Sequence, residues 1–143
     1  MKAIHLATAL ALVAGPLAAQ DAAVTYPFEG SFEDATFAVE SAIVGQGLVI
    51  DYVSHVGDML NRTGEDVGSD TQIFAGAEIY LFCSATVSRS VMEADPMNLV
   101  YCPYTIFVTE REGKVEIGHP TYPEGAMQEV QALLEGIVED ARN

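Results

Sequence analysis

The segment LVYCPYTIFVTEREGKVEIGH, residues 99–119, has the pattern of a β-hairpin. Residues 99–109 form the longest strand candidate of the chain, the polar residues 110–113 suit a turn, and residues 114–119 can pair back on the first strand. Because the two strands of a hairpin are antiparallel, a doubly wound parallel sheet is disfavoured. We therefore expect an α+β domain, with an antiparallel or mixed sheet and helices packed on one of its faces.

Strands and helices alternate along the rest of the chain in the order β-α-β-(α)-β-α-β-β-α. Ser31 and Asp34 have the spacing of a capping box at the start of a helix. The last helix is the clearest one, because a wide apolar stripe runs from Met127 to Ala141. The other strands are expected at residues 24–28, 48–53 and 73–83, and the helices at 31–45, 56–62, 84–94 and 124–142.

The first 19 residues have the pattern of a secretory signal peptide. Lys2 supplies a positive start, Ile4–Val13 is mostly apolar, and small residues precede Gln20. The apolar run is well short of the roughly 20 residues that span a bilayer. We therefore expect cleavage after Ala19, export to the bacterial periplasm without membrane insertion, and one domain over residues 20–143.

The chain is strongly acidic, with 21 Asp and Glu residues against 6 Lys and Arg residues and a formal net charge of −15. Removing residues 1–19 takes away one lysine and no acidic residue, which changes the charge from −15 to −16. Such a charge repels nucleic acid and anionic lipid, so we expect no nucleic-acid partner. An acidic surface most often serves solubility.

The two cysteines, Cys83 and Cys102, stand on either side of one short predicted helix. If the strands that they flank are antiparallel neighbours, both lie at the same edge of the sheet, and a Cα separation of roughly 5.5 Å is within reach. A parallel crossover would place them at opposite ends. Three interpretations stay open, namely a structural disulfide, free thiols that act as ligands or redox groups, and two inert buried thiols.

His55 and Met59 are four residues apart, so on a helix they would share a face and could serve as ligands of a cofactor. Thioether, imidazole and thiolate groups suit soft metals and haem iron. Cys83, Cys102 and Met92 are therefore candidate metal ligands. The alternative is that Met59 belongs to the core and His55 to a loop.

Motifs of known enzyme classes are absent from the sequence. It has no Gly-rich phosphate loop, no His-Glu-x-x-His, no Gly-x-Ser-x-Gly and no Cys-x-x-Cys. His55 and His119 are the only histidines after residue 19, too few for a three-histidine zinc site. We expect His119 at the surface just past a strand end, and we assign no catalytic residue.

Four segments resemble the domain of unknown function 302 family. They are YPFEGSFEDA, GLVIDYVSHVGDML, FCSATVSRSVMEADPMNLVYCPYTIFV and KVEIGHPTYPEG. The resemblance covers almost all of the chain after the signal segment. It implies a small α+β domain similar to the TATA-binding-protein-like fold and a symmetric homodimer. It also suggests an accessory protein of bacterial redox or sulfur metabolism.

Three functions follow as hypotheses. The first is a periplasmic binding module that holds a soft metal or haem, with haem or copper as the candidates, in one pocket where His55 lies near the cysteine-flanked segment. The second is a thiol- or sulfur-handling redox enzyme that uses Cys83 or Cys102, with a redox protein as its partner. The third is a structural or interaction dimer with a Cys83–Cys102 disulfide and no small ligand.

Overall fold

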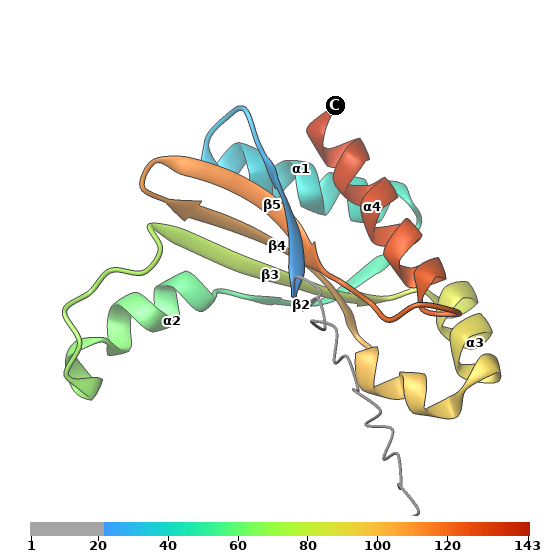
Figure 1. Ribbon diagram of the computed structural model, residues 1–143. Coiled ribbons are helices and arrows are strands. Elements are labelled where there is room, and N and C mark those ends of the chain that lie inside the picture. Colours follow the sequence, from blue (N-terminus) through green and yellow to red (C-terminus); the bar gives the residue numbers. More distant parts are fainter. Residues whose placement is uncertain (1–21) are drawn as a thin grey trace, which may run out of the picture.

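A computed structural model describes residues 22–143 as one sheet with helices packed against it (Figure 1). The strands are β1 (Ala23–Pro27), β2 (Val49–Ser54), β3 (Gly76–Cys83), β4 (Tyr104–Arg111) and β5 (Lys114–Pro120). The helices are α1 (Phe32–Gly45), α2 (Val56–Thr63), α3 (Ala85–Ala94) and α4 (Gln128–Arg142), with the short 3-10 helices η1 (Glu65–Val67) and η2 (Pro96–Tyr101). The signal segment expected at residues 1–19 lies outside the described residues.

The sheet has the strand order β1-β5-β4-β3-β2, and every neighbouring pair is antiparallel. The β4–β5 hairpin turns at Glu112 and Gly113, whose φ angles are 54° and 73°. Such positive angles belong to the tight turns that match the twist of paired strands. The expected α+β class is confirmed, and the sheet is antiparallel rather than mixed.

Helices α1 and α4 pack against each other and cover one face of the sheet (Figure 1). Alternate residues of the central strands are buried beneath them; these residues are Tyr80, Phe82, Tyr104, Ile106, Val108, Val115 and Ile117. The helices contribute Val39, Ile43, Val130, Leu134, Ile137 and Val138 to the same core. Removal of this apolar surface from water is the main stabilisation of the domain.

Helix α1 begins as the sequence predicts. The Ser31 hydroxyl accepts a hydrogen bond from the Asp34 N–H at 3.1 Å, and the Asp34 carboxylate accepts one from the Ser31 N–H at 3.1 Å. This capping box pairs two backbone donors that the helix itself leaves unpaired. The Ser31 hydroxyl and N–H also hold the pKa of Asp34 below its usual range, because both favour the ionised carboxylate.

The strand predicted at residues 99–109 begins later than expected. Residues Pro96–Tyr101 form η2, and β4 starts only at Tyr104. Asp95 caps this turn by accepting the Met97 N–H at 2.9 Å, and the Asn98 side chain donates to the Val91 carbonyl at 2.8 Å. These local bonds compete with strand pairing and prevail over the β-branched pattern.

The face of the sheet opposite α1 and α4 stays largely open among the described residues. Val49 and Tyr52 of β2 are 73% and 64% exposed there. The cross-strand register puts Ile79, Leu81 and Phe107 on the same face, where they are half-buried. Of the helices formed by residues 22–143, none has the length and apolar content needed to cross a membrane.

Candidate functional site

The two cysteines meet at one end of the sheet. Cys83 is the last residue of β3, and Cys102 directly follows η2, just before β4. Phe82 pairs with Tyr104, so the end of β3 and the start of β4 lie side by side. Both cysteines are partly buried, and their sulfur atoms are 2.6 Å apart. The proximity expected for antiparallel neighbours is thus confirmed.

The environment of Cys83 disfavours a thiolate. Burial, followed by the hydrogen bond with Cys102 and the negative charge of Asp51, raises the pKa of the Cys83 thiol to about 12. The Tyr104 N–H acts in the opposite direction but does not prevail. Cys83 is therefore a protonated thiol at neutral pH.

A layer of aromatic rings lies behind the thiol pair. Tyr122 packs edge-on against Tyr101 and Tyr104, with ring centroids 5.8 Å and 6.3 Å away. Burial raises the pKa of Tyr122 to about 12, so its phenol stays neutral. The Ser88 hydroxyl donates to the Tyr104 phenol oxygen at 3.1 Å. Both cysteines are only half-buried beside this aromatic layer.

Exposed apolar side chains border the pair on its outer side. Val49 is paired with Cys83 across the sheet, and the Cys102 N–H donates to the Leu99 carbonyl at 3.1 Å. Met97, Leu99 and Val100 of η2 are 67%, 63% and 68% exposed. We call Val49, Met97, Leu99 and Val100 the thiol rim.

The expectation that His55 lies near the cysteines is wrong. His55 follows Ser54 at the end of β2, where Ser54 pairs with Ile79, whereas Cys83 pairs with Val49 at the start of β2. The four strand positions from Ile79 to Cys83 span roughly 13 Å at the rise of an antiparallel strand. Helices α2 and α3, which follow these two places, lie at opposite ends of the sheet (Figure 1).

His55 belongs instead to a polar network. Its Nδ1 donates to the Glu78 carboxylate at 2.8 Å, since a carboxylate can only accept, and the Tyr80 hydroxyl donates to the other Glu78 oxygen at 2.8 Å. Burial, reinforced by Glu78, raises the pKa of Tyr80. A hollow of about 220 Å³ beside His55 is lined by further carboxylates, those of Glu33, Asp58 and Glu110.

The two methionine candidates lie apart from each other. Met59 is one helical turn beyond His55, since its N–H bonds to the His55 carbonyl at 3.2 Å, and it is 43% exposed. Met92 lies on α3, partly buried against the core. Within residues 22–143, no group of three or more His, Cys, Asp or Glu side chains is arranged to hold a metal ion. The expected soft-metal ligands are therefore divided between separate places.

A family model described as "Domain of unknown function DUF302" matches residues 23–143. The chain belongs to the DUF302 family. The fold also matches the crystal structure of an uncharacterized conserved DUF302 protein from Bacillus stearothermophilus, with a TM-score of 0.60 and 17% identity over 86% of this chain and 91% of that chain. No curated protein gives a sequence match.

His119 of this DUF302 domain is buried, which corrects the expected surface position. It lies on the helix-covered face of β5, opposite Val24, and is 0% exposed. Its Nδ1 donates to the Pro120 carbonyl at 2.9 Å, and its Nε2 is buried without a hydrogen-bond partner. Val115, Ile117 and His119 alternate in sequence, and this period of two is the signal that could have placed the histidine inside.

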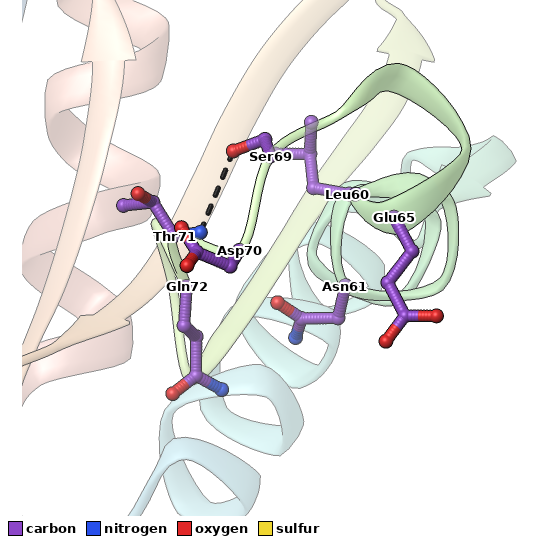
Figure 2. A pocket seen from close by; sticks show the side chains of 8 residues that line it. Leu60, Asn61, Glu65, Ser69, Asp70, Thr71 and Gln72 are labelled. Atoms are coloured by element: carbon purple, nitrogen blue, oxygen red, sulfur yellow. Dashed lines mark hydrogen bonds between the residues drawn. The ribbon is translucent and has the colours of Figure 1, made fainter.

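A larger hollow of about 340 Å³ lies between α2 and the loop that follows η1. Figure 2 shows its side chains, Asn61, Glu65, Asp70 and Gln72 among them, spread around the rim rather than directed at one point. The loop is held by local contacts such as the Thr71 N–H to the Ser69 hydroxyl at 3.4 Å. We assign no chemistry to this hollow in the DUF302 domain.

Sequence reasoning missed Glu78 as the partner of His55 and Tyr80 as the second partner of Glu78, and it missed the thiol rim. Glu78 carried a usable signal, because a single carboxylate interrupts the otherwise apolar β3 segment GAEIYLFC. A charged residue inside such a strand needs a partner. The thiol rim carried no such signal in the sequence, since apolar residues of the same types also occur in buried strands.

Proposed function

We propose that this DUF302 protein is an exported thiol–disulfide redox protein in which Cys83 and Cys102 interconvert between two thiols and one disulfide. The observation that carries the proposal is the 2.6 Å separation of the two sulfur atoms. An S–S bond of about 2.0 Å needs only a small adjustment of the two side chains. The signal-peptide pattern of residues 1–19 supports a periplasmic location, where disulfides form and persist.

Oxidation follows from thiol–disulfide exchange with a partner disulfide. One cysteine of the pair attacks the partner disulfide as its thiolate, forming a mixed disulfide and releasing one partner thiolate. The other cysteine then loses its proton and attacks the sulfur of the first, which releases the second partner thiolate. The two cysteines lose two electrons, and both partner sulfurs become thiols after taking up protons.

The division of the expected ligand set favours this function over a metal or haem site. His55 and Met59 lie at one end of the sheet, and the cysteines lie at the other. The two cysteines remain in contact, and a disulfide couple needs nothing more. A structural metal site usually has four ligands, so the two cysteines would supply only half of them. A bound Cu(I) ion is therefore an outcome that the test must detect.

The test counts thiols in the purified full-length exported protein after equilibration in redox buffers of dithiothreitol, with metal content and absorption spectrum measured in parallel. We expect two titratable thiols at low potential, none at high potential, and no stoichiometric metal or haem. Cys83→Ser and Cys102→Ser serve as controls and should keep one thiol throughout. Two thiols that persist in every buffer, or thiols accompanied by bound metal, would overturn the proposal.

A further inference from the structure

We infer that the thiol pair acts on disulfides carried by positively charged, apolar segments, which dock on the thiol rim. This inference rests on the proposed redox function and names its substrate class. It follows from two independent features of the cysteine end of the sheet, namely exposed apolar side chains and a local excess of negative charge.

The apolar feature is the thiol rim itself. Val49 is 73% exposed and the three η2 residues are each more than 60% exposed, although all are large and apolar. Two of the four are joined directly to the cysteines, since the Leu99 carbonyl accepts the Cys102 N–H and Val49 pairs with Cys83. Met97 and Val100 lie on the same 3-10 helix as Leu99. Covering such side chains stabilises a complex by roughly 25 cal/mol per Å² of apolar surface. A small polar disulfide leaves most of that surface in water.

The charge feature is an excess of acidic over basic side chains at the same end of the molecule. Asp51 lies on β2 near Cys83, and Asp95 and Glu124 line a hollow of about 220 Å³ beside η2. The one basic residue described there is Arg89, which is already bonded to Glu93 at 2.6 Å. A disulfide with positive groups is therefore attracted to this end, and an anionic one is repelled.

The other basic side chains of residues 22–143 lie away from the pair. Arg111 and Lys114 flank the β4–β5 turn, and Glu110 next to it pairs with Gly76, the opposite end of β3 from Cys83. Arg62 lies on α2, and Arg142 donates to the Pro27 carbonyl at 3.2 Å. None of these side chains offsets the negative potential around Cys83 and Cys102.

The experiment compares three disulfides as oxidants of the reduced full-length protein by measuring second-order rate constants. Glutathione disulfide is anionic, cystamine is cationic and small, and the disulfide dimer of the peptide Lys-Leu-Cys-Leu-Lys is cationic and apolar. At low ionic strength we expect cystamine to react at least about tenfold faster than glutathione disulfide, with the peptide dimer faster still. High salt should reduce the difference between cystamine and glutathione disulfide, because it screens charge. It should preserve most of the difference between the peptide dimer and cystamine.

Variants separate the two features. Leu99→Ser should slow the peptide dimer about tenfold and leave cystamine unchanged, whereas Val67→Ser, a 77% exposed valine in η1, should change neither rate. Glu124→Gln should slow both cationic probes at low salt, and Glu65→Gln in η1 should not. Circular dichroism confirms that these surface variants keep the fold.

The possible failures are distinct. Equal rate constants for the three probes, or a faster reaction of glutathione disulfide, would overturn the substrate class and leave the redox function standing. Equal loss of cystamine and peptide reactivity in Leu99→Ser would overturn the rim as a docking surface. Absence of disulfide formation with every probe would sink the redox function and this inference together.

Discussion

At the scale of single residues, the burial of Cys83 controls how the thiol pair responds to pH. Burial raises the pKa of its thiol to about 12, so reduction of a Cys83–Cys102 disulfide takes up at least one proton at any lower pH. We expect the midpoint potential to fall by at least about 30 mV for each unit of rising pH, the value for one proton in a two-electron couple. A midpoint that stays constant from neutral to mildly alkaline pH would contradict a buried, protonated Cys83.

The Tyr80 hydroxyl is the buried member of the network that holds Glu78 and His55. Tyr80→Phe removes its bond to the Glu78 carboxylate at 2.8 Å and its longer contact with the Thr36 carbonyl at 3.4 Å. It should lower the free energy of unfolding by about 1.5–3 kcal/mol, the usual worth of a hydrogen bond to a charged group. Urea denaturation at neutral pH measures the change. Tyr52→Phe is the matched control, because Tyr52 is 64% exposed and should lose almost nothing. Equal stability of the two variants would show that the network does not support the fold.

Residue positions were predictable from sequence where a period or a pairing determined them. Cys83 and Cys102 flank one helix between antiparallel neighbours, and this alone brings them to one sheet edge. His55 was misplaced because the sequence does not say which end of β2 lies beside Cys83. Since β2 and β3 are antiparallel, the start of β2 lies beside Cys83, and His55 follows the other end of β2. His119 was misplaced because polarity was weighed above its alternation with Ile117.

At the scale of elements, the capping box of α1 is a local device with a measurable worth. Ser31→Ala removes the hydroxyl that accepts the Asp34 N–H, and we expect it to cost about 1 kcal/mol of unfolding free energy. Ser41→Ala in the middle of the same helix is the control and should be neutral or slightly stabilising, because alanine is the better helix former. Equal effects of the two substitutions would contradict the cap.

The cap also makes the stability of α1 depend on pH. The pKa of Asp34 is lowered in the folded state, so its contribution is present above the pKa of the unfolded chain and is lost as pH falls through the folded value. Loss of stability as the pH falls below about 3.8, the ordinary pKa of an aspartate, should therefore be smaller in Ser31→Ala than in the unmodified chain. A pH dependence that is the same in both would exclude this contribution.

Element types were predictable wherever hydrophobic periodicity and caps agreed, as in α1 and α4. They were not predictable in η2, where the apolar residues 99–101 resemble the start of a strand. Asp95 and Asn98 hold that run in a turn through bonds of 2.9 Å and 2.8 Å, and a propensity argument does not anticipate such side-chain contacts. This difference matters for the proposed function, because η2 supplies Met97, Leu99 and Val100 of the thiol rim.

At the scale of the whole molecule, helices cover one face of the sheet, and the other face exposes apolar residues of β2 beside half-buried ones of β3 and β4. We expect the part of this open face around Tyr52, Ile79 and Phe107, away from Val49 and the cysteine end, to pair with the same part of a second copy, which gives a symmetric homodimer. Light scattering at micromolar concentration should show twice the mass of one chain. The Tyr52→Ser substitution should shift the measured mass toward that of one chain.

Phe37→Ser is the matched control for the dimer, because Phe37 is 72% exposed but belongs to α1 on the opposite side of the sheet. It should leave the mass unchanged. A clean single-chain mass for the unmodified protein would contradict the homodimer. The thiol pair could still function in that case, since both cysteines belong to one chain.

A redox titration of the purified protein, in which alkylated and bonded cysteines are counted by mass spectrometry, tests the proposed thiol–disulfide function most directly. The expected result is one reversible two-electron transition between a form with free Cys83 and Cys102 and a form in which these two residues are linked to each other. Cys83 and Cys102 that stay free across all accessible potentials, or that can be linked only irreversibly, would contradict a thiol–disulfide redox function.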